Sequence, residues 1–339
     1  MELFTGDNDR GRRLDRVLRK ALPDLPLALI HRLLRQGQVF IDGKAAKAQD
    51  RFEKQVTITI PSMKDQQKSI NSSKINEFDL HNEGFKEQKH SKPGKNLPPL
   101  EIIWEDAGLM AVNKPVGLAV HGPESLDTMV QAYLEGKLPA SLSFRAGPLH
   151  RLDKPSSGIV VFSTSLDGAR LFTSLLRERK VRKTYLAIVE GSVEKEEIWE
   201  DDLVRDKEKK KTFVKEQTPK GCRQTCGSAP ILNAVTKVTP LAVKGGYSLL
   251  QAEIATGRTH QIRAQAAAHG HPLAGDLKYK EQRVKNREQR IENKEQRKEH
   301  LVEFFLHARR LEFLDYIIEA PMPEKFRSKV EEIFGCVPQ

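Results

Sequence analysis

The stretch that decides the fold is HRLDKPSSGIVVF, residues 150–162. It places one carboxylate, Asp153, between the cations Arg151 and Lys154, and continues with a Pro-Ser-Ser-Gly turn and an apolar run. A turn of this composition followed by β-branched and aromatic residues predicts a loop that leads directly into a strand. An arbitrary Asp beside Pro and Ser would hydrogen-bond its own turn. From the local residues alone, this turn role is the better interpretation of Asp153.

The size and charge of the chain suit a protein with a polyanionic partner. The chain has 339 residues and a net charge of +11, and nearly all of the positive excess lies in residues 1–100 and 278–300. Such a surplus attracts a phosphate backbone, although it also favours solubility. Three cysteines form no disulfide framework or zinc motif, and no apolar run reaches membrane-spanning length. We therefore expect a soluble, cytoplasmic protein without a membrane segment.

Residues 1–62 have the pattern of a compact module of two helices and a hairpin. Apolar residues recur at helical spacing in 12–20 and again from Pro26 to Gly37. Short strands are predicted at 39–41 and 56–60, the first of them ending in an Asp-Gly turn. This pattern predicts a small domain that folds on its own core.

The rest of the chain consists of a linker, 63–99, and a second domain, 100–339. The linker is polar, has almost no apolar residues and shows no period, which predicts a flexible segment. Within the second domain, 191–230 is charged and predicts surface loops and short strands, and the insert 278–300 predicts a long solvated helix. Periodicity predicts strands at 102–104, 109–112, 159–162, 184–189, 234–238, 247–254 and 304–313, and helices at 127–134, 166–179 and 259–269.

Two further motifs follow the Asp153 loop. The first is KTYLA at 183–187, and the second is GRTHQIR at 257–263, followed by Gly-His-Pro and Gly-Asp. With HRLDKPSSG they resemble, in wording and order, stretches of the RluA/RluC/RluD family of RNA pseudouridine synthases, whose catalytic motif is His-Arg-Leu-Asp with a following Thr or Ser and Ser-Gly. Ser156 stands where Thr is more usual, a conservative departure.

This resemblance implies a fold and a set of site residues. The fold is α+β, a mainly antiparallel mixed sheet with flanking helices and a cleft across the sheet. Asp153 is the implied catalytic carboxylate, Tyr185 the active-site tyrosine and Arg263 the cation that pairs with Asp153. A facing guanidinium favours the ionised form of a shielded carboxylate. The residues implied to flip the base or contact RNA near the site are Arg151, His150 and Arg258.

The N-terminal module resembles an S4 RNA-binding domain, which many members of that family carry. The resemblance rests on LLRQGQVFIDG at 33–43. It implies that Arg32, Arg35 and Lys44 contact structured RNA. An ordinary solvated face explains each of these three cations equally well.

The implied activity is isomerisation of specific uridines in structured RNA. Large-subunit ribosomal RNA is the first expected substrate, with transfer RNA as the alternative. The reaction has no net redox change, and we expect a monomer without cofactor or metal. The spacing of His260, His269 and His271 fits no common zinc pattern. A non-catalytic RNA-binding or ribosome-assembly factor is the rival from another class, and a methyltransferase is disfavoured because no glycine-rich cofactor loop follows a strand.

Overall fold

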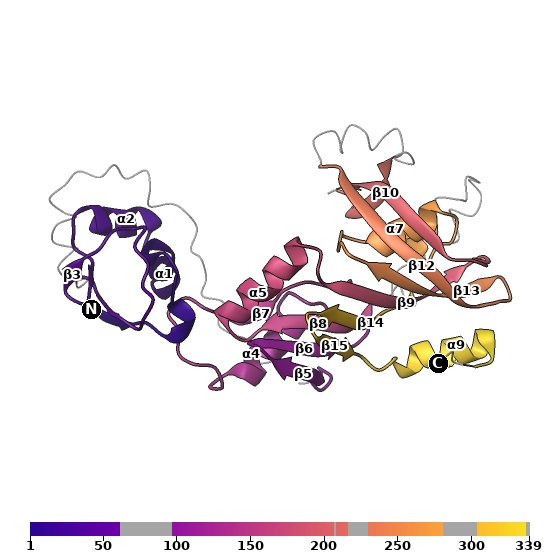
Figure 1. Ribbon diagram of the computed structural model, residues 1–339, viewed down its shortest axis with the longest axis horizontal. Coiled ribbons are helices and arrows are strands. Elements are labelled where there is room, and N and C mark those ends of the chain that lie inside the picture. Colours follow the sequence, from indigo (N-terminus) through magenta and orange to yellow (C-terminus); the bar gives the residue numbers. More distant parts are fainter. Residues whose placement is uncertain (62–96, 207, 216–229, 281–303, 337–339) are drawn as a thin grey trace. The chain divides into compact units, whose positions relative to one another are not determined.

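The computed structural model describes residues 1–61, 97–206, 208–215, 230–280 and 304–336 (Figure 1). The chain divides into two compact units. The first combines the N-terminal part of the chain with Val130–Gly147 and Thr164–Gly168, and the second contains the described remainder. The predicted linker and the predicted helix of the 278–300 insert lie almost entirely outside the described residues. Within the described ranges, no helix is both long enough and apolar enough to cross a membrane.

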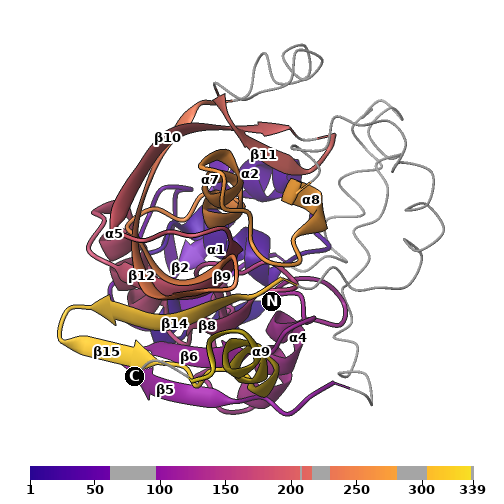
Figure 2. The same cartoon turned by 90° about the vertical axis from the view of Figure 1, so that its right-hand side faces the viewer.

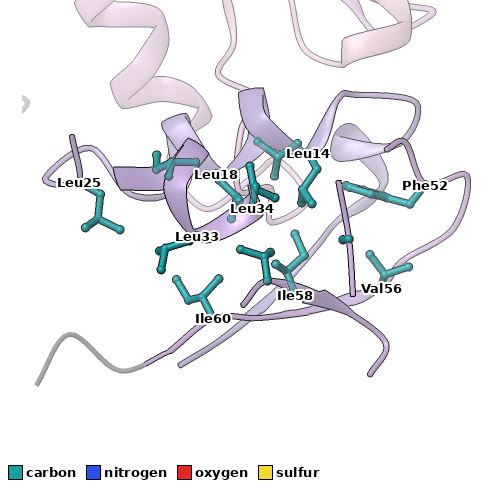
Figure 3. Packing of buried hydrophobic residues seen from close by; sticks show 13 residues of the cluster. Leu14, Leu18, Leu25, Leu33, Leu34, Phe52, Val56, Ile58 and Ile60 are labelled. Atoms are coloured by element: carbon teal, nitrogen blue, oxygen red, sulfur yellow. The ribbon is translucent and has the colours of Figure 1, made fainter. Parts of the chain in front are cut away.

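The first unit packs two helices on a four-stranded sheet of order β1-β4-β2-β3. Leu14, Leu18 and Leu34 of the helices point towards Ile58 of the sheet, and all four are buried (Figure 3). Asp42 and Gly43 both have positive φ, which is the backbone of a tight two-residue hairpin. The predicted helices and hairpin are therefore present. The elements are β1 (Glu2–Phe4), a 3-10 helix (Asp7–Asp9), α1 (Leu14–Ala21), α2 (Leu27–Arg35), β2 (Phe40–Ile41), β3 (Lys44–Ala45) and β4 (Thr57–Thr59).

A buried carboxylate joins distant segments within the first unit. Asp9 is fully buried, and its carboxylate accepts hydrogen bonds from the backbone N–H groups of Gly6, Leu142 and Ser143, each at 2.9 Å. Burial alone would raise the pKa of Asp9, but these bonds and those from the Ser143 and Ser141 hydroxyls lower it. The charge of Asp9 thus holds the loop around Leu142 against the N-terminal residues.

A large mixed sheet dominates the second unit. Its strand order is β11-β10-β12-β13-β9-β14-β8-β6-β5, with β15 on β14 and β7 on β8. All pairings in this order are antiparallel except the short parallel contact of β14 with β8. The predicted α+β class with a mainly antiparallel mixed sheet is confirmed. The strands are β5 (Ile102–Asp106), β6 (Leu109–Lys114), β7 (Gly147–Pro148), β8 (Ser157–Ser163), β9 (Arg182–Glu190), β10 (Glu197–Asp206), β11 (Lys211–Val214), β12 (Leu232–Lys244), β13 (Tyr247–Ile254), β14 (Leu306–Phe313) and β15 (Tyr316–Glu319).

Helices cover the buried central strands. β8 is buried at every position, and β9 is buried from Lys183 to Val189, as expected of strands covered on both faces. The side chains of Phe172 and Phe326 pack into two separate apolar clusters, and Figures 1 and 2 show α7 beside β10 and β12. The helices are α4 (Leu126–Leu134), α5 (Leu166–Arg177), α7 (Gln261–Ala268), α8 (Leu277–Lys280) and α9 (Glu324–Phe334).

The expectation of loops and short strands at 191–230 is wrong for β10. This ten-residue strand pairs with β12 over seven positions, and its Trp199 is almost fully buried. Acidic residues at 200–202 concealed the strand in the sequence. The buried Gln265 amide of α7 donates to the Trp199 carbonyl at 2.9 Å and to the Asp201 carboxylate at 2.8 Å, so the polar strand is satisfied from the helix.

Gly158 in the quoted motif is required by a close approach of two strands. It has φ +107°, and a Cβ built there would lie 2.2 Å from the backbone oxygen of Ala308. We expect Gly158→Ala to lower the free energy of unfolding by more than about 3 kcal/mol, since strain and a backbone clash add. Gly117→Ala is the matched control, because Gly117 has φ +84° with nothing within 4 Å of a built Cβ. Equal losses in denaturant unfolding would refute the importance of the β8–β14 contact.

Candidate active site

A buried lysine holds the loop that carries Asp153. Lys114, at the end of β6, is fully buried, and its Nζ donates to the carbonyls of Pro115 and Leu118 at 2.9 Å and of Lys154 at 3.3 Å. Burial lowers the pKa of Lys114 to about 7, and the charge of Asp153 limits the drop. The Lys154 carbonyl also accepts from the Gly117 N–H at 2.9 Å. The position of Asp153 is thus fixed through its neighbour's backbone.

Arg263, in the first turn of α7, joins two carboxylates. Its Nη1 donates to Oδ2 of Asp153 at 2.8 Å, while Nε and Nη2 donate to Oδ2 and Oδ1 of Asp276 at 2.7 and 2.9 Å. Asp276 is fully buried, whereas the Asp153 side chain keeps 18% exposure. Burial opposes the charge of Arg263, but hydrogen bonds and charge from Asp276 and Asp153 raise its pKa above the ordinary value. The guanidinium is therefore permanently charged, and its planar fork is oriented by Asp276.

Tyr185 lies beside Asp153 in the same pocket. It sits in β9, opposite Ala252 of β13 and Ala308 of β14. Burial, with a smaller contribution from the charge of Asp153, raises the pKa of Tyr185 above its ordinary value, so its hydroxyl keeps its proton. The pocket is lined by Arg151, Leu152, Asp153, Ser156, Tyr185, Ile254, Gly257, Arg258, His260, Gln261, Ile262, Arg263 and Leu306.

Two of the predicted cations also line this pocket. Arg151 is exposed, two residues before Asp153. Arg258 is partly buried, and its Nε is a buried donor without a hydrogen-bond partner among the described residues. Native structures rarely leave such a donor unpaired, so an oxygen-bearing ligand in the pocket would satisfy it.

His150 has a different position from the one expected. It does not line the pocket, and its Nε2 accepts a hydrogen bond from the Val161 N–H at 3.0 Å. Burial lowers the pKa of His150 to about 3, so the ring is neutral, and it stacks with Phe172. Because Nε2 of His150 already accepts the hydrogen bond from a backbone N–H of β8, the position of His150 does not support a part in the reaction.

The predicted RNA-contacting residues of the N-terminal module lie in the first unit. Arg32 and Arg35 are in the last turn of α2, and Lys44 begins β3. Arg35 and Lys44 are exposed and Arg32 is half-buried. Their side chains form no ion pair with any residue of the described ranges, which leaves their charges available to a ligand.

Sequence reasoning missed three residues that surround the pair of Asp153 and Arg263. Asp276 anchors Arg263, His260 places Nε2 3.7 Å from Oδ2 of Asp153, and the Tyr279 hydroxyl lies 3.0 Å from Nδ1 of His260. Asp276 and His260 were both part of the quoted motifs, which were the available signals. Tyr279, at the start of the predicted 278–300 insert, gave none.

The three histidines weighed as metal ligands have separate partners. His260 faces Tyr279, His269 faces Asp201 at 3.1 Å, and Nδ1 of His271 lies 3.2 Å from the Glu190 carbonyl. Within the part of the chain that the structure describes, no three His, Cys, Asp or Glu residues are grouped so that they could hold a metal ion.

Residues 108–268 match the family model described as RNA pseudouridylate synthase. The matched segment contains Asp153, Tyr185 and Arg263, the residues that meet in the pocket. Together with the curated relatives described next, this match supports the assignment of the chain to the RNA pseudouridylate synthases. The resemblance inferred from its motifs is confirmed.

Curated relatives match almost the whole chain. "Ribosomal large subunit pseudouridine synthase C" of Vibrio vulnificus is 28% identical over 315 residues, which cover 92% of this chain and 88% of the relative. The protein of the same name from Escherichia coli K12 is 26% identical over 332 residues, covering 96% and 94%. The similarity therefore extends beyond the catalytic motifs to the N-terminal and C-terminal parts of the chain.

Two solved structures share the fold of this synthase. "Human RNA Pseudouridylate Synthase Domain Containing 4" aligns with a TM-score of 0.55 and 21% identity, covering 70% of this chain and 95% of that chain. "Human RNA Pseudouridylate Synthase Domain Containing 1" aligns with a TM-score of 0.52 and 20% identity, covering 70% and 88%. These similarities support the fold alone.

Replacing Asp276 tests the role of the anchor. Asp276→Asn removes the buried charge and turns an amide NH2 towards Arg263, so we expect a loss of about 3 kcal/mol in stability. We also expect kcat to fall at least about 100-fold, because the guanidinium is no longer held against Asp153. Calorimetry and initial rates of pseudouridine formation measure the two effects. Asp201→Asn, which changes a carboxylate that does not line the pocket, is the control. A folded Asp276→Asn protein with full activity would contradict the anchoring role.

Proposed function

We propose that this chain converts specific uridines of large-subunit ribosomal RNA to pseudouridine, with Asp153 as the catalytic carboxylate. The observation that carries the proposal is the contact between Asp153 and Arg263 in a pocket that also holds Tyr185, in a chain of the RNA pseudouridylate synthase family. The printed names of the relatives support ribosomal RNA as the substrate class.

The geometry suits a reaction that moves no electrons to or from a cofactor. The bond from C1′ of the ribose to N1 of uracil breaks, a bond from C1′ to C5 forms, and the proton that leaves C5 is balanced by one taken up at N1. An ionised carboxylate next to the sugar or the base starts this sequence. Arg263 donates a hydrogen bond to Oδ2 of Asp153 at 2.8 Å and so orients this carboxylate towards the substrate.

We propose that Tyr185 acts after Asp153 has reacted. The negative charge of Asp153 is one cause of the raised pKa of Tyr185. That charge disappears when Asp153 forms a bond to the substrate, so proton exchange through the Tyr185 hydroxyl becomes easier at that stage. We assign Tyr185 the transfer of the C5 proton on this basis.

The pocket requires a uridine that has left its stack. Enzymes that act on a base inside structured nucleic acid rotate it into a pocket. Arg151 is exposed at the pocket and is the side chain we propose to occupy the vacated place. Arg258, with its unpaired Nε, is proposed to hold an oxygen of the flipped nucleotide.

We further propose that the N-terminal unit is an S4-like RNA-binding module that works through Arg32, Arg35 and Lys44. These three side chains form no ion pairs with other described residues. We also infer that the protein acts as a monomer in the cytoplasm, where the exposed free thiol of Cys336 stays reduced. Transfer RNA as substrate, or RNA binding without turnover, remain the competing functions.

Asp153→Asn tests the proposed activity in the purified protein. We expect no pseudouridine above background in a large-subunit ribosomal RNA transcript, because the amide is not a nucleophile, with RNA affinity within about two-fold of the wild type. Mass spectrometry of digested RNA measures the product, and filter binding measures affinity. Asp315→Asn, at an exposed position, is the matched control and should retain full activity.

The outcome separates the competing functions. Product in transfer RNA transcripts alone would replace the substrate class and keep the chemistry. Tight RNA binding without product by the wild type on either substrate would favour the non-catalytic factor. Product from Asp153→Asn at more than about one hundredth of the wild-type rate would remove Asp153 from the catalytic role.

A further inference from the structure

Tyr279 makes polar contacts to two elements that flank the active-site pocket. It is in α8, is 2% exposed, and its hydroxyl oxygen accepts a hydrogen bond from the Thr212 N–H of β11 at 3.0 Å. The same oxygen lies 3.0 Å from Nδ1 of His260. The hydroxyl of Thr212 in turn donates to the Thr259 carbonyl at 2.8 Å, which holds the residue before His260.

These contacts decide which nitrogen of His260 carries the proton. If Nδ1 carried it, the Tyr279 oxygen would accept two hydrogen bonds and its own buried proton would have no acceptor among the described residues. Such an unpaired buried donor costs about 1–3 kcal/mol. The Tyr279 hydroxyl therefore donates to Nδ1, and the proton of His260 is on Nε2.

Nε2 of His260 faces the catalytic carboxylate. It lies 3.7 Å from Oδ2 of Asp153, the same oxygen that accepts from Arg263 at 2.8 Å. Burial lowers the pKa of His260 to about 4 despite the opposing charge of Asp153, so the ring is neutral and holds one proton. No hydrogen bond from a described residue reaches Oδ1 of Asp153.

We propose that Tyr279 is a positioning residue that fixes His260 with its proton on Nε2, so that His260 and Arg263 both direct donors at Oδ2 of Asp153 and leave Oδ1 as the reacting oxygen. The distance from His260 is slightly long for a hydrogen bond and shortens when the substrate closes the pocket, as catalytic hydrogen bonds do. When Oδ1 bonds to C1′ the C1′–N1 bond breaks, and when it adds to C6 of the base the C5–C6 π bond opens. In either case Oδ2 becomes the carbonyl oxygen of the ester, and both donors continue to stabilise it.

The proton position can be measured without any assumption about activity. We expect nitrogen NMR of the full chain, labelled in its histidines, to show Nε2–H for His260 in the wild type. Tyr279→Phe keeps the ring against Arg263 and removes only the hydroxyl, so a mixture of both tautomers should appear. Tyr316→Phe removes a hydroxyl that donates to Asp106, away from the pocket, and should leave the His260 signals unchanged. A proton on Nδ1 in the wild type would overturn the proposal.

Kinetic measurements then test how the Tyr279 hydroxyl affects turnover, an effect that rests on the proposed function. His260→Gln has no ring tautomers, so it is the background in which the Tyr279 hydroxyl cannot set the position of a ring proton. We expect its kcat to be lower than that of the wild type, because the Nε2–H donor is lost. Tyr279→Phe should lower kcat about ten-fold with KM nearly unchanged, because about one hydrogen bond to the reacting group is lost. In the His260→Gln background, Tyr279→Phe should lower kcat at most about two-fold, which is roughly the error of the measurement.

The possible results distinguish a failure of the role proposed for Tyr279 from a failure of the proposed function. An equal ten-fold loss from Tyr279→Phe in both backgrounds would show a purely structural role and overturn the proposal. Wild-type protein without any pseudouridine product would refute the proposed function, and the NMR result would then decide the tautomer alone. Should Tyr279→Phe not fold, the wild-type NMR signals of His260 still decide the same question.

Discussion

The structure of the site depends on how one guanidinium divides its donors between two carboxylates. Arg263 gives two N–H groups to the buried Asp276 and one to the partly exposed Asp153. Two anions around one buried cation would be costly unless the hydrogen bonds were complete, and here each contact is 2.9 Å or shorter. The arrangement leaves Asp153 oriented and open to the pocket, as uridine isomerisation requires.

The scaffold supplies this arrangement from parts that are distant in the chain. α7 carries Arg263, the turn before α8 carries Asp276, and the loop before β8 carries Asp153. Lys114 fixes the last of these through the Lys154 carbonyl, and the close approach of Gly158 to Ala308 sets β8 against β14. Because strands β8 and β9 are buried along almost their whole length, small displacements of these anchors are resisted by packing.

Motif order revealed Asp153, Tyr185 and Arg263 from the sequence, and the structure brings all three into one pocket. Periodicity found most helices and strands of both units, since their apolar patterns are strong. It missed β10, whose Asp201 accepts a hydrogen bond from Gln265 of α7. It also missed the hydrogen bonds by which Asp9 holds the loop at 141–143. Thr212 and Tyr279 lie 67 positions apart in the sequence and are joined by one hydrogen bond. No local sequence pattern indicates such a contact. For His150 the motif suggested a position in the site, but its Nε2 accepts a hydrogen bond from the backbone of β8.

The most direct test of this account is a crystal structure of the chain with an RNA that contains its target uridine. We expect the uridine to be turned out of its stack into the pocket, with a reacting carbon about 3–3.5 Å from Oδ1 of Asp153. Arg263 should keep its contacts with Asp276 and with Oδ2 of Asp153. A uridine bound elsewhere, or one facing Oδ2 with Arg263 displaced, would contradict the account.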